Sequence, residues 1–255
     1  MERMLAATAV AEDTHYWFRG LRRTADLLLT QAAAGRPLAR IVDCGAGTGR
    51  NLDWLSRHGS AIGIELTPLA LDIGRRRGRR LVRGTVTALP LADSSVDLTT
   101  SFDVLYCLDE PSERQALREM WRVLKPGGLV LVNVAALDVL HGSHSTLTHE
   151  LRRYTPSRLR HRLESAGLTV ERLTFTNMCL FLPALAVRGI ERLTGHAGEA
   201  SESDLRVPPA PVNATLDGTL ALEAVLLRAI NLPIGTSLMA IARKQQIKSD
   251  LEGEE

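Results

Sequence analysis

Several features that mark specialised protein classes are scarce or missing in this sequence. Its 255 residues include three cysteines, Cys44, Cys107 and Cys179, which lack the spacing of a metal site and indicate small buried residues of a reducing compartment. No apolar run reaches the ~18 residues of a membrane-spanning helix. The first ten residues contain Glu2 and Arg3 and are not typical of a signal peptide. The sequence therefore predicts a cytoplasmic protein with no integral membrane segment and no metal.

Net charge and aromatic content are also low. The formal net charge of +2 leaves no electrostatic footprint for nucleic acid. One basic run, residues 75–80, is interpreted as the solvated face of a helix in preference to a contact for an acidic carrier protein. Aromatic residues make up 4% of the chain, yet Tyr16, Trp17 and Phe18 are adjacent. The 45% hydrophobic and 24% charged residues are ordinary for a soluble globular protein.

The most informative segment is IVDCGAGTG, residues 41–49. A short apolar strand ends in Asp43 and runs into a turn with Gly45, Gly47 and Gly49. Such a turn after the first strand of an open parallel sheet binds nucleotide-like ligands, and glycine supplies the positive φ angles that it needs. The third glycine precedes Arg50, one position too early for the dinucleotide pattern G-x-G-x-x-G. The turn therefore favours a nucleotide-like ligand other than a dinucleotide.

A second acid follows the next predicted strand. Residues 61–64 are a short apolar strand, and Glu65 stands at its end, where a carboxylate can accept both hydroxyls of a ribose. Residues 129–134 form another buried strand after a helix at about 112–124, which Lys125 and the glycines 127–128 are expected to end. Repeated alternation of strand and helix predicts a doubly wound α/β sheet.

The acid-x-Gly-x-Gly-x-Gly pattern from Asp43 to Gly49 resembles motif I of class I S-adenosylmethionine (SAM) methyltransferases. Residues 83–108 resemble the third and fourth strands of the type 11 branch, with Leu89-Pro90 ahead of Asp97. The resemblance covers about residues 13–244 and implies an α/β fold, a Rossmann-like, mostly parallel seven-stranded sheet. It also implies an N-terminal helical cap (1–36), a SAM-binding core (37–177), a helical insertion before the last strand (178–232), and a final strand with a charged tail (233–255).

The resemblance implies SAM as cofactor and S-adenosylhomocysteine as product. Thr85 stands where many relatives have an acid for the adenine amino group, and its hydroxyl is a weaker, uncharged acceptor. Arg19 or Arg23 would meet the SAM carboxylate, and the adjacent aromatics would either wall the pocket or form a hydrophobic staple. The cofactor-binding residues implied are Asp43, Gly45, Ala46, Gly47, Glu65, Leu66, Thr85, Val86, Asp103 and Arg19.

About sixty residues separate a strand at 168–175 from the last strand at 237–242, too many for a structureless loop. We expect two helices around a linker, one over the apolar run 178–187 and one at about 216–230. A separate helix at 158–166 precedes the strand at 168–175. The insertion would form a lid over the acceptor pocket or a homodimer surface. A membrane-surface helix ranks behind these, because the apolar run 178–187 is too short to span and lacks a basic flank on its early side. Its apolar positions favour a hydrophobic small-molecule acceptor, such as a secondary metabolite.

The predicted function is SAM-dependent methyl transfer to an O, N or C atom of a small hydrophobic molecule. The alternatives are a SAM-binding enzyme that catalyses a cyclisation or elimination, and a catalytically silent SAM-binding protein. Histidine suits a base near neutral pH. The resemblance selects His149, which precedes an Arg-Tyr-Thr segment, with His15 and Tyr106 as alternates. The three histidines of the loop 135–154 could equally be solvated residues without a catalytic role.

Overall fold

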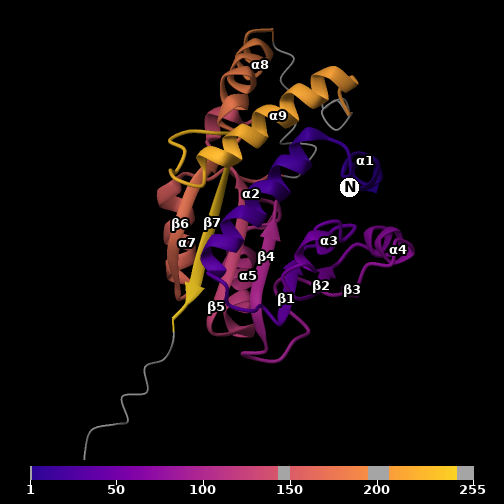
Figure 1. Ribbon diagram of the computed structural model, residues 1–255, viewed down its shortest axis with the longest axis vertical. Coiled ribbons are helices and arrows are strands. Elements are labelled where there is room, and N and C mark those ends of the chain that lie inside the picture. Colours follow the sequence, from indigo (N-terminus) through magenta and orange to yellow (C-terminus); the bar gives the residue numbers. More distant parts are fainter. Residues whose placement is uncertain (1, 143–149, 195–206, 246–255) are drawn as a thin grey trace, which may run out of the picture.

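The computed structural model describes residues 2–142, 150–194 and 207–245 (Figure 1). A seven-stranded sheet with the order β3-β2-β1-β4-β5-β7-β6 forms the centre of this part of the chain. The strands are β1 Arg40–Cys44, β2 Ser60–Glu65, β3 Leu81–Arg83, β4 Val96–Phe102, β5 Leu124–Ala135, β6 Leu168–Thr176 and β7 Ser237–Lys244. The predicted fold class, a Rossmann-like and mostly parallel sheet, is confirmed.

The parallel part of the sheet contains a change of direction in strand order. β1 pairs in parallel with both β2 and β4, while β3 continues on one side and β5 on the other. The chain therefore builds outward from β1 in one direction and then, from β4, in the other. At such a switch point the loops after the two central strands diverge and leave room for a ligand. The topology places the ligand site beyond the carboxyl ends of β1 and β4.

The N-terminal and inserted helices pack on one another. Helix α1 (Glu2–Ala11) contacts α4 (Pro68–Arg76), and α2 (Tyr16–Ala33) packs against β5, β7 and α9 (Ala210–Leu226). The short turn η3 (Met178–Leu180) and helix α8 (Phe181–Thr194) precede α9 in the sequence, and both helices contact η3. Figure 1 shows α8 and α9 at one end of the molecule, with α2 crossing in front of the sheet. β7 then returns between β5 and β6, antiparallel to both.

Both faces of the sheet are covered, as β5 illustrates. Val130, Val132 and Val134 face a core shared with α5 (Glu110–Val123) and α7 (Pro156–Ser165). Leu129 and Leu131 face the opposite core, shared with α2 and the short helix α3 (Leu52–Leu55). Alternate side chains of a strand point to opposite faces, so a strand with helices on both sides is apolar throughout. This is why the segment lacks polar alternation.

The ends of two helices bear on the sequence predictions. Helix α2 begins at Tyr16, so the adjacent aromatics lie in its first turn. Helix α5 ends at Val123, within one residue of the predicted end, but Lys125 and the glycines 127–128, which were expected to end it, belong to β5. Lys125 does not cap the helix, because its ammonium donates at 2.7 Å to Asp97 of the neighbouring strand β4.

The basic run 75–80 is only partly a solvated face. Arg76 is exposed in the last turn of α4, but the Arg79 side chain is 6% exposed. Arg79 and Arg77 both bind the buried carboxylate of Glu12, at 3.0 and 2.6 Å. The solvated interpretation was therefore wrong for Arg79, because an acid distant in the sequence pairs with it.

Candidate functional site

The residues predicted to bind the cofactor follow the carboxyl ends of four neighbouring strands. Asp43 lies near the end of β1, ahead of the turn 45–49, and Glu65 ends β2. Thr85 comes two positions after β3, and Asp103 directly follows β4. Because β3, β2, β1 and β4 are parallel neighbours, these residues line one edge of the sheet. The edge is the one at the switch point.

The glycine turn depends on left-handed backbone angles. Gly45, Gly47 and Gly49 have φ values of 79°, 55° and 76°, which side chains disfavour. The Gly45 amide donates to the Ile64 carbonyl at 2.9 Å, which ties the turn to β2. A Cβ at Gly45 would lie 2.4 Å from Val104 Cγ2, whereas one at Gly47 would meet nothing within 4 Å. The turn is therefore packed at its start and bordered by open space at its middle.

Glu65 has a second task besides the predicted one. Its Oε2 accepts a hydrogen bond from the Gly47 amide at 2.9 Å, and its Oε1 accepts from the Thr67 amide at 2.7 Å. The residue is 9% exposed, so the carboxylate is held in one place. Two oxygens have about four acceptor positions in total, which leaves capacity for two adjacent hydroxyls. The same side chain braces the turn and can receive a ribose.

Asp43 is a buried acid with an unsatisfied oxygen. Its Oδ1 accepts from the Thr100 hydroxyl at 2.6 Å, while Oδ2 has no hydrogen-bond partner among the described residues. Burial raises the pKa of Asp43 to about 7, against the lowering effects of side-chain hydrogen bonds from Thr100 and Asn51 and with a further increase from nearby Glu65. A buried, unpaired carboxylate oxygen is costly unless a ligand satisfies it. The oxygen fits a cationic or N–H group, such as the ammonium of SAM.

The other predicted contacts already have local partners. Asp103 has a φ of 60°, and its Oδ1 accepts from Asn133 Nδ2 at 2.9 Å. The Thr85 hydroxyl lies 2.9 Å from the Thr87 hydroxyl and accepts from the Thr87 amide at 3.3 Å. Leu66 is 60% exposed. An adenine group would therefore share the Thr85 oxygen with Thr87, and Leu66 can cover a ligand without losing core contacts.

Both arginines considered for the SAM carboxylate face the insertion. Arg19 forms an ion pair with Asp217 of α9 at 2.9 Å, and Arg23 binds the other oxygen of Asp217 at 3.1 Å. Contact of Arg19 with SAM stays a prediction, and would require the Arg19 guanidinium to bind the SAM carboxylate and Asp217 at the same time. The two ion pairs with Asp217 connect the N-terminal cap to α9.

The three candidate bases differ in surroundings. His15 caps α2, where its Nδ1 accepts from the Trp17 amide at 3.2 Å, and burial lowers the pKa of the imidazole. Tyr106 lies in the turn η1 (Leu105–Cys107), and burial, followed by Asp103, raises the pKa of its phenol well above the ordinary value. His149 lies outside the described residues.

Sequence analysis missed two polar groups at this edge. Asn133 interrupts the apolar strand LVLVNV, a signal that could have identified the partner of Asp103. Glu12 gave no local signal. It is 3% exposed, accepts from the Thr48 hydroxyl at 2.5 Å, and binds Arg79, which also donates to the Thr48 carbonyl at 3.0 Å. Glu12 thereby fastens the N-terminal cap to the back of the glycine turn.

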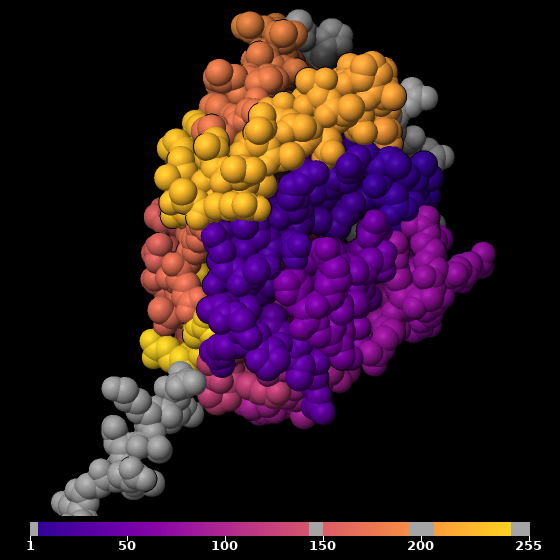
Figure 2. Space-filling model, in the orientation of Figure 1, coloured from indigo at the N-terminus to yellow at the C-terminus, as the bar shows by residue number. Residues whose placement is uncertain are grey.

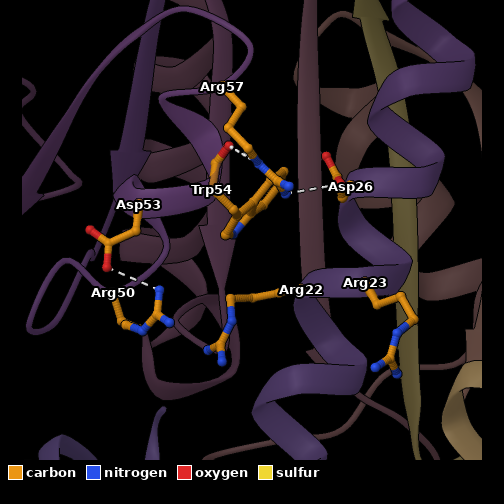
Figure 3. A pocket seen from close by; sticks show the side chains of 7 residues that line it. All are labelled: Arg22, Arg23, Asp26, Arg50, Asp53, Trp54 and Arg57. Carbon is orange, nitrogen blue, oxygen red and sulfur yellow. Dashed lines mark hydrogen bonds and ion pairs between the residues drawn. The ribbon is translucent and has the colours of Figure 1, made fainter. Parts of the chain in front are cut away.

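A surface hollow between α2 and α3 is a separate feature (Figure 3). Arg50 pairs with Asp53 and Arg57 with Asp26, each at 3.0 Å. The hollow shares Arg23, the alternative to Arg19 for the SAM carboxylate, with the residues considered for the cofactor. Its lining consists of Arg22, Arg23, Asp26, Arg50, Asp53, Trp54 and Arg57. We interpret the hollow as an ion-paired seam between two helices.

Part of the core is similar to a known protein family. Residues 42–132 match the model of the family described as "Methyltransferase domain". The chain is 31% identical over 124 residues to a malonyl-[acyl-carrier protein] O-methyltransferase of Serratia marcescens, covering 47% of this chain and 48% of that protein. It is 35% identical over 108 residues to a demethylmenaquinone methyltransferase of Renibacterium salmoninarum, covering 41% and 45%. The chain therefore spans about half the length of these relatives.

The fold is shared with solved structures. The Haemonchus contortus phosphoethanolamine N-methyltransferase 2, determined in complex with SAM, superimposes with a TM-score of 0.59 at 14% identity. The match covers 96% of this chain and 58% of that one. At this identity the likeness establishes the architecture.

Proposed function

We propose that this chain, whose residues 42–132 are a class I SAM-dependent methyltransferase domain, transfers methyl from SAM to an O, N or C atom of a small hydrophobic acceptor. The observation that best supports the cofactor part is the bond from the Gly47 amide to Glu65. This bond holds Glu65, our proposed ribose acceptor, and the glycine turn in a fixed relation, and a Cβ at Gly47 would meet open space. When bound, SAM supplies a methyl group that its sulfonium activates.

The tasks of the protein are to hold and to orient. Glu65 would receive the ribose hydroxyls, and the free oxygen of Asp43 would receive the ammonium of the methionine part. Backbone and side-chain donors hold both carboxylates in place before a ligand binds. Little side-chain conformational entropy would therefore be lost on binding. The acceptor would lie beyond β4, where holding it near attack distance supplies most of the rate.

His149 remains our proposed base for an acceptor that carries a proton. The alternates are less suited, because Tyr106 keeps its proton at neutral pH and His15 uses Nδ1 as an acceptor for the α2 cap. The Leu151 amide donates to the Tyr106 carbonyl at 2.9 Å. The segment that follows His149 in the sequence therefore lies against η1, the turn shortly after β4. We expect His149→Ala to lower turnover ~10²-fold and to leave SAM affinity unchanged, the effect of losing a general base. Wild-type turnover in this variant would exclude His149.

The test of function is product formation. The protein is incubated with SAM and a panel that includes a demethylated quinone, a malonyl thioester and small hydrophobic alcohols and amines. Mass spectrometry then follows the formation of S-adenosylhomocysteine and a mass gain of about 14 Da in the acceptor, which is the CH₂ that methylation adds. Glu65→Ala provides the control for background hydrolysis of SAM.

Two outcomes would contradict the proposal. A rearranged acceptor with SAM unconsumed would favour a cyclisation or elimination. SAM binding without any chemistry across the panel and across ligands that co-purify would favour a silent binding protein. The proposal of a hydrophobic acceptor rests on the apolar composition of the run 178–187, and the two relatives differ in the acceptors that their names give.

A further inference from the structure

Helix α9 has an unusual distribution of charge. Between Ala210 and Leu226 its charged residues are Asp217 and Glu223, which are 9% and 6% exposed. Asp217 is bound by Arg19 and Arg23, and Glu223 accepts from the backbone amides of residues 177 and 179. Surface helices ordinarily turn charge to solvent and apolar side chains to the core. Here both charges face the protein and leave the outer face without any.

The outer face of α9 is apolar. Leu222 is 70% exposed, Val225 55% and Leu226 49%. Their spacing of three and four residues places them on one side of the helix. The exposed positions one and two turns earlier are Gly218 and Thr215, which are small and uncharged. Single exposed leucines are common, but a contiguous uncharged helix face marks a contact surface.

Helix α8 lies at the same end of the molecule as α9 and also has exposed apolar side chains (Figures 1 and 2). Leu182, Ile190 and Leu193 are 71%, 61% and 89% exposed, and their positions fall within one side of the helix. We call the exposed side chains of Leu182, Ile190, Leu193, Leu222, Val225 and Leu226 the apolar end surface. Within the described residues, no helix has the length and hydropathy to cross a bilayer.

Among the described residues from 181 to 230, the exposed charged side chains are of one sign, namely Arg192 and Arg228. Arg188 and Glu191, whose side chains are 14% and 20% exposed, pair with each other at 2.5 Å. A leaflet with anionic headgroups attracts arginine, and its acyl boundary accepts leucine and valine. A second copy of the chain would bring the same arginines together and gain no such attraction.

We infer that the apolar end surface docks this protein on an anionic lipid bilayer. The interaction is peripheral, with α8 and α9 lying in the interface. It is independent of whether methyl is transferred, because it involves no residue of the cofactor edge.

The test is flotation of the full chain with lipid vesicles, without SAM. Vesicles of equal parts phosphatidylcholine and phosphatidylglycerol are compared with vesicles of phosphatidylcholine alone. We expect the wild type to float with the anionic vesicles and Leu222→Glu with Leu193→Glu to lower the bound fraction about tenfold or more. Val10→Glu with Val82→Glu adds the same charge at exposed apolar positions elsewhere, 78% and 42% exposed, and should bind as the wild type does. Circular dichroism melting shows that each variant is folded.

Three results would overturn the inference. The wild type stays in the unbound fraction with both vesicle types. The Leu222→Glu, Leu193→Glu variant floats as well as the wild type. Sedimentation velocity shows a dimer that this variant dissociates, which would make the surface a self-association interface.

Discussion

Glu65 Oε2 accepts a hydrogen bond from the Gly47 amide at 2.9 Å, across the gap between the second strand and the glycine turn. The side chain predicted to bind the ribose thus also shapes the turn. Ligand contact and loop geometry depend on one carboxylate.

Replacing Glu65 should therefore reduce cofactor affinity for two reasons, the loss of the predicted ribose contact and the loss of support for the glycine turn. We expect Glu65→Ala to weaken binding of SAM and S-adenosylhomocysteine by roughly 1.5–3 kcal/mol, the range for hydrogen bonds to a charged group. Titration calorimetry measures the change. Asp72→Ala is the matched control, because it removes an exposed acid of α4 whose ion pair, within the described part of the chain, is with Arg76. Unchanged SAM affinity in Glu65→Ala, or tight NAD binding without SAM binding, would contradict the site.

The two glycines of the turn should differ in their tolerance of a side chain. Gly45→Ala combines an unfavourable φ of 79° with a clash at 2.4 Å against Val104, whereas Gly47→Ala has an unfavourable φ of 55° and no clash. We expect a loss of about 2–4 kcal/mol in the free energy of unfolding for Gly45→Ala and about 1–2 kcal/mol for Gly47→Ala. Urea denaturation gives both values.

Val104→Ala supplies the internal check. Added to Gly45→Ala, it removes the clashing methyl groups and should recover part of the lost stability. A double variant whose loss equals the sum of the two single losses would show that the contact is not the cause.

The buried Asp43 should make stability depend on pH. Its folded pKa of about 7 lies above the ordinary 3.8, so the folded state holds the proton more tightly than the unfolded state. The stability that this group contributes is fully present below the unfolded pKa and is lost as pH rises toward 7. The loss is on the order of 4 kcal/mol above that range.

Asp43→Asn cannot ionise and reports this loss directly. We expect wild type and variant to unfold at similar urea concentrations near pH 4, and the variant to become the more stable of the two as pH rises to about 8. Parallel stability curves over this range would mean that Asp43 ionises in the folded protein without cost. Asp97→Asn, at an acid paired with Lys125 at 2.7 Å, controls for loss of a carboxylate elsewhere.

The contact from Glu12 to the turn should influence both stability and cofactor affinity. Glu12→Gln leaves the buried Arg79 without its full counter-charge and loosens Thr48. Removal of one partner of a buried pair costs about 3–5 kcal/mol. We also expect the SAM dissociation constant to rise, as measured by calorimetry at a temperature where the variant is folded.

Asp13→Asn is the neighbouring control, since Asp13 is 51% exposed in its pair with Arg50. Exposed pairs contribute about 0–1 kcal/mol, so this variant should behave nearly as the wild type. Equal effects of the two substitutions would show that burial of Glu12 has no special role.

The residues that could be predicted from the sequence are those that lie in short, local motifs. Asp43, the glycines and Glu65 follow strand ends, and parallel strands bring their ends to one edge, so short-range patterns were enough to place them. Asn133 was visible in principle as the polar residue of an apolar strand. Glu12 with Arg79, and Arg19 with Asp217, join positions 67 and 198 residues apart, and no periodicity encodes such pairs. The basic run was misinterpreted for this reason.

The position of β7 has a consequence for synthesis of the chain. β7 lies between β5 and β6, although residues 237–244 are made after both. Until they leave the ribosome, each of the two older strands has an edge with unpaired amides and carbonyls. The parallel strands β1 to β5 can form earlier, because all their partners are already present. During synthesis the parallel strands can therefore be folded while the edges of β5 and β6 are still unpaired and prone to aggregation. These edges become paired only when the eight residues of β7 have been made.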